Sequence, residues 1–196
     1  EGDIRYFSME LIEGKMVREW FRNFPVGLSS RWGELRRVLE QFASAVEYLH
    51  DHQVLHCDLK CSNMMITSGN RAVLLDLGLA IRAGQENRLV GTLQYMAPEL
   101  IEGGSATYAS DWYSFGVMIY EVLTDSFPPI EIDLSNSGVR GTKYSLDLEK
   151  VRYLLRDCPT DLMDLCIELL RADPSRRPRC SDVVQRLSGT KKARMR

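Results

Sequence analysis

Hydrophobic residues recur along much of the chain at the three- and four-residue steps of an amphipathic helix. The clearest stretch predicts a long helix from Ser30 to about Asp51, with Ser29 or Ser30 as its N-cap. Its apolar positions are Leu35, Val38, Leu39, Phe42, Val46 and Leu49. Residues 112–123 are apolar nearly all round, which indicates a buried central helix that ends before Pro128. Further helices are expected at about 148–156, 160–171 and 181–187.

Short apolar runs predict a small amount of β structure. Residues 4–12 form a run that leads to Gly14, which is typical of a strand entering a turn. The runs 64–66 and 72–76 flank the sequence Thr-Ser-Gly-Asn, which suits a hairpin turn. Residues 77–104 and 130–144 show no sustained period, so we expect loops there. The predicted fold class is therefore mainly α with a small β hairpin.

Composition narrows the class of protein. The chain has 196 residues, 44% of them hydrophobic and 27% charged, which is ordinary for one globular domain. A formal net charge of -2 lacks the basic excess of a nucleic-acid binder. Five cysteines without a CxxC pair favour a reducing compartment, and we expect a cytoplasmic protein. No apolar run approaches the roughly 18 residues of a membrane-spanning helix.

Candidate chemistry is concentrated in the stretch His-Cys-Asp-Leu-Lys-Cys-Ser-Asn at residues 56–63, between the long helix and the hairpin. Asp76-Leu77-Gly78 follows, and Ala97-Pro98-Glu99 closes the next loop. In this order and context the three motifs resemble those of the protein kinase family. The resemblance implies a kinase-like large (C-terminal) lobe with the small lobe largely missing. It assigns residues 1–14 to the last small-lobe strand and hinge, 15–188 to the large lobe and 189–196 to a basic tail.

The resemblance also implies roles for individual residues. Within a catalytic loop at 56–63, Asp58 would accept or orient the substrate hydroxyl and Lys60 would sit near the transferred phosphate. Asn63 and Asp76 would hold two Mg²⁺ ions, with Asp76 opening an activation segment at 76–99. Thr92 is expected to hydrogen-bond Asp58 and Lys60. Lys60 and Thr92 together imply that protein substrates are modified on serine or threonine.

Other matched positions concern the nucleotide and the framework. By the resemblance, Met9 lies behind the adenine pocket of ATP, the backbone of Glu10 and Ile12 pairs with adenine, and Met65 packs beneath the ring. Asp111 is expected to brace the catalytic loop, and Glu99 to pair with Arg177.

The sequence departs from the family pattern in three respects. It has no glycine-rich phosphate loop, strand lysine or helix glutamate, so we expect this chain alone to be inactive and to need the missing small lobe. Cys57 stands where many members carry arginine, and residues 79–91 contain no Ser, Thr or Tyr. Activity should therefore not require phosphorylation of that loop. Cys61 and Ser62 replace residues that are often proline and acidic, and Glu121 is left as a candidate for selecting a basic substrate residue.

Three alternatives accompany this interpretation. The chain could be a kinase-like regulatory or scaffold module with little catalysis, although the intact polar residues of the two motifs count against that. His56, Cys57 and Cys61 could suggest zinc, but no second ligand cluster has zinc-site spacing, and packing of His56 beside Leu77 is favoured. The basic tail could attract anionic lipid, but a solvated end is favoured.

Overall fold

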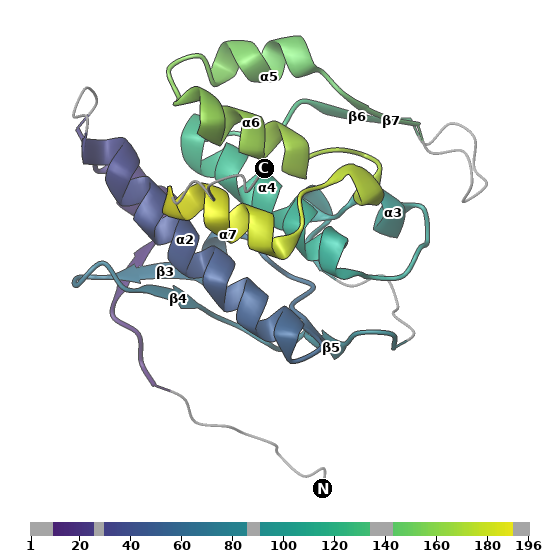
Figure 1. The fold of residues 1–196 in the computed structure, drawn as a ribbon, viewed down its shortest axis with the longest axis horizontal. Helices are drawn as coiled ribbons and strands as arrows, with labels where there is room; N and C mark the ends of the chain where they lie inside the picture. Colours follow the sequence, from purple (N-terminus) through teal and green to yellow (C-terminus); the bar gives the residue numbers. More distant parts are fainter. Residues whose placement is uncertain (1–9, 26–29, 86–90, 134–142, 190–196) are drawn as a thin grey trace, which may run out of the picture.

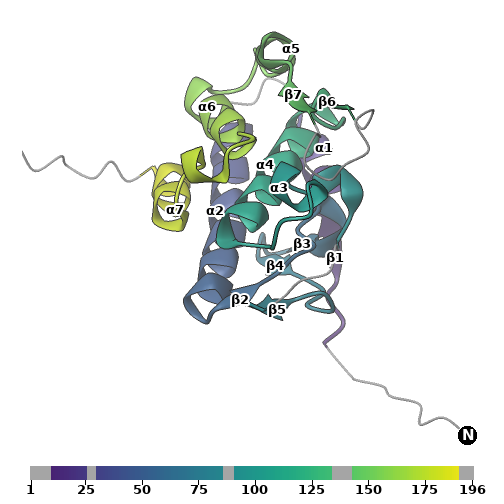
Figure 2. The ribbon, with the colours of Figure 1, turned by 90° about the vertical axis from the view of Figure 1, so that its right-hand side faces the viewer.

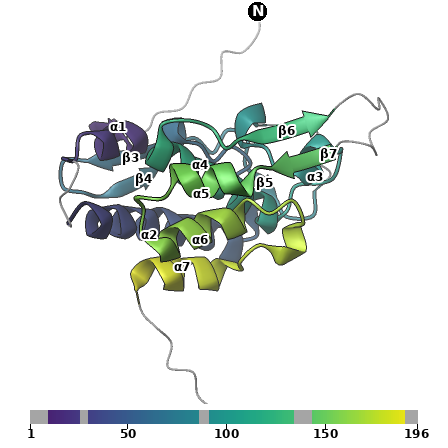
Figure 3. The same cartoon turned by 90° about the horizontal axis from the view of Figure 1, so that it is seen from above.

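The structure is a computed structural model that describes residues 10–25, 30–85, 91–133 and 143–189 (Figure 1). Two long helices, α2 (Ser30–Asp51) and α4 (Tyr108–Thr124), form its centre. α2 lies between the strand pair β3–β4 and helix α7, as Figures 2 and 3 show from two sides. α4 packs against α6. The shorter helices are α1 (Val17–Arg22), α3 (Pro98–Ile101), α5 (Leu148–Leu154), α6 (Thr160–Leu169) and α7 (Cys180–Ser188).

The two long helices follow the sequence pattern. α2 buries Leu35, Leu39, Phe42 and Val46 on one face, as its spacing predicts. α4 begins with a capping box between Thr107 and Ser110 and is buried over most of its length, which confirms the predicted central helix.

Three small antiparallel sheets complete the fold. Strands β1 (Gly14–Met16), β3 (Met64–Thr67) and β4 (Ala72–Leu74) are ordered β1-β3-β4, and Met65 faces Val73 across the predicted hairpin. β2 (Val54–Leu55) pairs with β5 (Ile81–Arg82). β6 (Ile130–Asp133) pairs with β7 (Lys143–Leu146). Single turns of 3-10 helix lie at η1 (Cys61–Asn63), η2 (Leu93–Tyr95) and η3 (Pro174–Arg176).

Several expectations from the sequence were wrong in detail. The loop expected at 77–104 contains β5, η2 and α3, and the loop expected at 130–144 begins with β6 and ends in β7. These elements are two to four residues long, which is too short to show a clear period. Residues 10–12 of the strand expected at 4–12 carry no element, and its residues 4–9 lie outside the described part. α1 was not predicted.

Among the described residues, no helix combines the length and apolar character that crossing a membrane requires.

Candidate active site

A buried aspartate fixes the backbone of the loop at residues 56–63. The Asp111 carboxylate, on the first turns of α4, accepts hydrogen bonds from the backbone N–H groups of His56 and Cys57, both at 2.9 Å. Its Oδ2 also lies 2.9 Å from His50 Nε2 at the end of α2. Cys57 adopts a left-handed conformation with φ 64°, which two hydrogen bonds to one carboxylate can hold in place. The expected bracing contact is therefore present.

Four polar side chains converge next to this brace. Thr92 Oγ1 donates to Asp58 Oδ1 at 2.8 Å, and Lys60 Nζ lies 2.6 Å from Asp58 Oδ2 and 3.0 Å from Thr92 Oγ1. Asn63 Nδ2 donates to the Asp58 backbone oxygen at 2.9 Å and to Oδ2 at 3.2 Å. The Asp58 carboxylate is buried yet contacted on both oxygens, so its orientation is fixed. We refer to Asp58, Lys60, Asn63 and Thr92 as the Asp58 cluster.

Asp76 is placed close to this cluster by the strands. Leu75 N donates to the Asn63 backbone oxygen at 2.8 Å, which ties the end of the hairpin to the loop. Asp76 itself has φ 61° and is exposed, and its Oδ1 accepts a hydrogen bond from Gly78 N at 3.0 Å. The Asn63 side-chain nitrogen, Nδ2, donates to Asp58, and the backbone oxygen of Asn63 accepts from Leu75 N. The side-chain oxygen of Asn63, Oδ1, is therefore the group able to bind a ligand.

Gly91 holds the following segment against the loop. Its φ is 115°, and a Cβ added there would lie 2.6 Å from the Cys57 backbone oxygen. Only glycine combines this conformation with such a close approach. The next residue is Thr92, so this backbone contact delivers the threonine hydroxyl to Asp58.

Three of the four residues expected to border adenine lie in the described part of the chain. Met9 lies outside the described residues. Glu10 is exposed and within 3.8 Å of Arg71, Ile12 is half-buried, and Met65 is half-buried on β3. No hydrogen bond of the described residues links these positions to the Asp58 cluster.

His56 is fully buried, and its Nε2 lies 3.2 Å from the Leu75 backbone oxygen. Its core placement agrees with the expectation, although the predicted neighbour Leu77 is largely exposed. Burial, together with the negative charges of Asp111 and Asp58, raises the pKa of the Cys57 thiol to about 12. Across the described residues, no three His, Cys, Asp or Glu side chains are grouped so that they could hold a metal ion.

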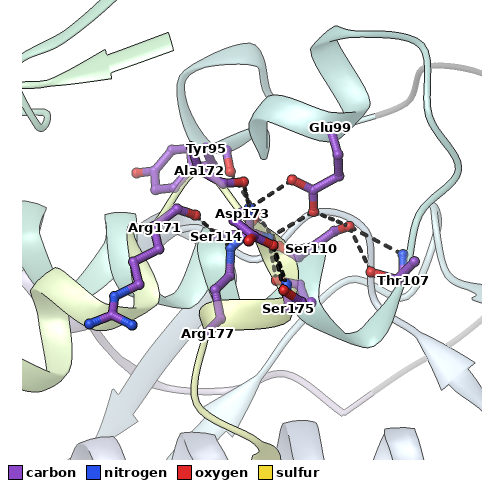
Figure 4. A network of polar contacts seen from close by, with 11 residues as sticks. Tyr95, Glu99, Thr107, Ser110, Ser114, Arg171, Ala172, Asp173, Ser175 and Arg177 are labelled. Atoms are coloured by element: carbon purple, nitrogen blue, oxygen red, sulfur yellow. Dashed lines mark hydrogen bonds and ion pairs between the residues drawn. The ribbon is translucent and has the colours of Figure 1, made fainter.

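A second carboxylate, which is partly buried, lies behind the segment that carries Thr92. Glu99 on α3 receives two hydrogen bonds from the Arg177 guanidinium, both at 2.7 Å, and one from Ser110 Oγ at 2.9 Å (Figure 4). Arg177 also donates to the backbone oxygens of Ala109, Arg171 and Ala172. We refer to Glu99, Ser110 and Arg177 as the Glu99 cluster; it contains the pair expected from the sequence.

Glu121 has a role that the sequence did not indicate. Its Oε1 accepts a hydrogen bond from Arg18 Nη1 at 2.9 Å, and its Oε2 accepts one from the Tyr95 hydroxyl. The expectation that Glu121 selects a basic substrate residue is therefore not supported, because the carboxylate is buried and both oxygens are engaged.

An apolar cavity beside Thr92 was also missed. It measures about 270 Å³ and lies between η2 and the end of α4, with Leu93, Met96, Phe127 and Ile130 in its wall. Leu93 and Phe127 are 62% and 44% exposed, which is unusual for large apolar side chains. Leu93 follows Thr92 directly, so the cavity adjoins the Asp58 cluster. Its wall combines Tyr113 of α4 with residues of η2, α3 and the segment 127–130, and no spacing rule links these positions.

Comparison with known proteins gives consistent matches. A model of the protein kinase domain matches residues 1–187. The inhibitor of nuclear factor kappa-B kinase subunit beta of Bos taurus is 34% identical over 133 residues, 65% of this chain and 18% of that protein. The probable serine/threonine-protein kinase kinX of Dictyostelium discoideum is 27% identical over 192 residues, 96% of this chain and 17% of that protein.

A bacterial protein gives a similar match. The serine/threonine-protein kinase PrkC of Bacillus subtilis is 32% identical over 134 residues, 65% of this chain and 20% of that protein. The chain thus spans about a fifth of the length of these three relatives.

Proposed function

The chain belongs to the protein kinase family, and from this membership we propose that it carries the transfer chemistry of a protein serine/threonine kinase. The reaction would move the γ-phosphate of ATP to serine or threonine hydroxyls of protein substrates. The single observation that carries this proposal is the Asp58 cluster, in which a carboxylate, an ammonium group and a hydroxyl lie within 3.0 Å of one another.

Phosphoryl transfer depends on positioning and on charge more than on covalent participation by the protein. Asp58 would accept a hydrogen bond from the substrate hydroxyl and orient it, and Lys60 would lie beside the negative charge that develops on the phosphoryl group. Thr92 would hold both side chains at the correct separation. Its 3.0 Å contact with Lys60 supports the choice of serine and threonine substrates.

The family uses ATP and Mg²⁺ in general, and the residues here fit a magnesium ion. Mg²⁺ prefers oxygen ligands, and the Asp76 carboxylate and the side-chain oxygen of Asn63 supply them. A bound Mg²⁺ would neutralise charge on the phosphates. The exposure of Asp76 and the hydrogen bond that fixes Asn63 Nδ2 to Asp58 support this assignment.

We also propose that residues 1–14 correspond to the last small-lobe strand and the hinge, residues 15–188 to the large lobe, and residues 189–196 to a basic tail. Met9, Glu10 and Ile12 would border adenine, and Met65 would pack beneath it from its half-buried position on β3. The groups that cover the phosphates would come from a small lobe outside these residues. The five free cysteines support a reducing compartment such as the cytoplasm.

Activity would not depend on phosphorylation of the loop at residues 79–91. Residues 79–91 contain no Ser, Thr or Tyr. Gly91 also supports this proposal, because it packs directly on the backbone of Cys57, the position at which many members have an arginine that binds a phosphate. Thr92 is the hydroxyl to test, because it is the first after this loop. An active protein in which Thr92 must carry phosphate would overturn the proposal.

The test measures transfer of labelled phosphate from ATP to a generic protein substrate by a protein that joins this chain to a small lobe. The Asp76→Ala variant, which removes one proposed magnesium ligand, is the control. Transfer onto serine or threonine above that control is expected. Equal signals from the two proteins would favour a kinase-like regulatory module instead, and transfer onto tyrosine alone would contradict the assignment from Lys60 and Thr92.

A further inference from the structure

A cavity of about 570 Å³ lies between helix α1 and the turn that joins β3 to β4. This volume is in the range of small-molecule sites in proteins. The cavity is bordered by residues 13–15 at the start of β1, by Trp20 of α1 and residues 23–25 just beyond it, and by residues 66–68 and 70. None of the residues assigned to the transfer reaction contributes to its wall, so it is separate from the proposed active site.

One wall of the cavity is aromatic. Trp20 lies on α1 and Phe24 lies two residues beyond the end of that helix, and their rings meet edge to face with centroids 4.8 Å apart and an interplanar angle of 70°. Pro25 and Ile66 extend this apolar surface. A flat ring bound here would lie against aromatic and aliphatic atoms, an environment that favours planar apolar groups.

The rim is polar and supplies both donors and acceptors. It includes the side chains of Asn23, Ser68 and Asn70. The described residues provide no hydrogen-bond partner for these two amides or for the Ser68 hydroxyl. Asn70 is held in a left-handed conformation with φ 56°, and its backbone oxygen accepts from Gln41. Its position is therefore fixed while its amide stays available to a ligand.

The charges at the rim select against an ionic ligand. Glu13 and Lys15 both border the cavity, and Lys15 Nζ lies 3.9 Å from the Glu19 carboxylate. Each sign of charge is thus present and no surplus of either faces the cavity. A ligand with a net charge would lose its hydration without gaining an ion partner. The polar edge of an uncharged ligand can instead form hydrogen bonds with the side-chain amides of Asn23 and Asn70.

The strand β3 separates this cavity from the face assigned to the nucleotide. Successive residues of a strand point to opposite sides, so Met65 and Ile66 face apart. Ile66 borders the cavity, and Met65, proposed to pack under adenine, does not. A ligand in the cavity would therefore contact the other side of the same strand and need not compete with ATP.

We propose that this cavity is a binding site for an uncharged heteroaromatic small molecule. Its ring packs on Trp20 and Phe24, and its polar edge hydrogen-bonds to the amides of Asn23 and Asn70 and to the Ser68 hydroxyl. The proposal does not rest on the phosphotransfer function, because it concerns residues outside the Asp58 cluster.

Fluorine NMR of the protein that joins this chain to a small lobe tests the site directly, with 5-fluoroindole as the ligand and 5-fluoroindole-2-carboxylate as the charged comparison. Ser68→Tyr fills the cavity from an exposed turn position and leaves the helix packing intact. Asn70→Gly removes an amide while retaining the left-handed backbone that glycine accepts. Ser181→Tyr, an exposed serine on α7 that does not border the cavity, is the matched control.

We expect 5-fluoroindole to bind with a dissociation constant of about 1 mM, typical of a weak fragment, and its fluorine signal to broaden when protein is added. This broadening should persist when excess ATP is added. Binding should weaken at least about tenfold in Ser68→Tyr, weaken less in Asn70→Gly and stay unchanged in Ser181→Tyr. The carboxylate should bind more weakly than the neutral compound. Undetectable binding, equal binding by Ser68→Tyr, preferred binding of the carboxylate, or displacement by ATP would each overturn the proposal.

Discussion

The Asp58 and Glu99 clusters are built from similar parts and differ in how tightly they are closed. In each, a carboxylate on a short segment accepts hydrogen bonds from a cationic side chain and from a hydroxyl group. The Lys60 side chain remains 23% exposed, whereas the Arg177 side chain is 0% exposed. The clusters thus differ in the exposure of the cation and not of the carboxylate, because the Asp58 side chain is 6% exposed and the Glu99 side chain 18%.

The choice of cation explains this difference. Arg177 has five N–H donors in a rigid plane, and it uses them on both Glu99 oxygens and on three backbone carbonyls. Lys60 is a flexible point charge that contacts Asp58 and Thr92 and can move toward another anion. The comparison teaches that a fully satisfied arginine fixes structure, while a partly exposed lysine leaves the cation of the cluster able to reach a ligand.

The strongest test of this contrast is removal of the Asp58 charge. Asp58→Asn keeps the size of the side chain but cannot orient or accept a proton as a carboxylate does. Phosphate transfer should fall by about 10²- to 10⁴-fold, the usual contribution of a positioned general base. The measurement is the rate of labelled phosphate transfer in a protein that includes the small lobe.

The melting temperature of the same variant supplies the control. We expect a small change, because Lys60 can turn toward solvent when its partner is neutralised. A large loss of stability with little loss of transfer would reverse the roles of the two clusters.

Arg177→Met should have the next largest effect, on stability. It leaves the Glu99 carboxylate largely buried without its cation and three carbonyls without their donor, so unfolding should become easier by about 3 to 5 kcal/mol. Urea denaturation followed by circular dichroism measures this free energy.

Arg186→Met is the matched control. Arg186 pairs with Glu168 at 2.7 Å, but both side chains are about one-third exposed, at 33% and 34%. This loss should cost only about 0 to 1 kcal/mol. Equal destabilisation by the two variants would show that closure of the Glu99 cluster does not determine its strength.

How much the sequence predicted depends on how local each feature is. The loop at residues 56–63 and the helices α2 and α4 follow from residues close together in the chain, either as a motif or as a period. The Glu99–Arg177 pair was reached only through the family resemblance, because its members are 78 positions apart.

Features made by distant, non-periodic segments were missed. The binding of Arg18 and Tyr95 to Glu121 joins α1, η2 and α4, and no spacing rule links these positions. The cavities beside Leu93 and beside Trp20 likewise depend on how loops meet helices. The pairing of β6 with β7 was missed although β6 alternates apolar and charged residues, because four residues are too short a run to stand out from the polar segment that follows.

Thr92→Val sharpens the comparison within the Asp58 cluster, since valine keeps the shape and removes the hydroxyl. Hydrogen bonds to charged groups contribute about 1.5 to 3 kcal/mol. If that energy fixes the reacting geometry, transfer should slow by about ten- to a hundredfold.

Thr92→Ser retains the hydroxyl and should preserve most of the rate. Steady-state kinetics of both variants provide the measurement. A fully active Thr92→Val protein would show that Asp58 and Lys60 hold their positions without the third member.

Cys57 reports on the negative charge around the Asp58 cluster through its reactivity. Burial and the carboxylates of Asp111 and Asp58 raise the pKa of its thiol to about 12, from 9.0 for a free thiol. Because the thiolate is the reactive form, alkylation by iodoacetamide at pH 8 should be about a thousandfold slower in the folded protein than after unfolding in urea.

The same shift gives a pH dependence of stability. The unfolded thiol loses its proton near pH 9 and the folded one only near pH 12, so this residue contributes decreasing stability as pH rises through that interval. Peptide mapping after timed alkylation follows Cys57 separately from the other cysteines. Rapid labelling of Cys57 at pH 8 in the folded protein would mean that the loop opens readily, and that its backbone hydrogen bonds to Asp111 do not hold it as the structure indicates.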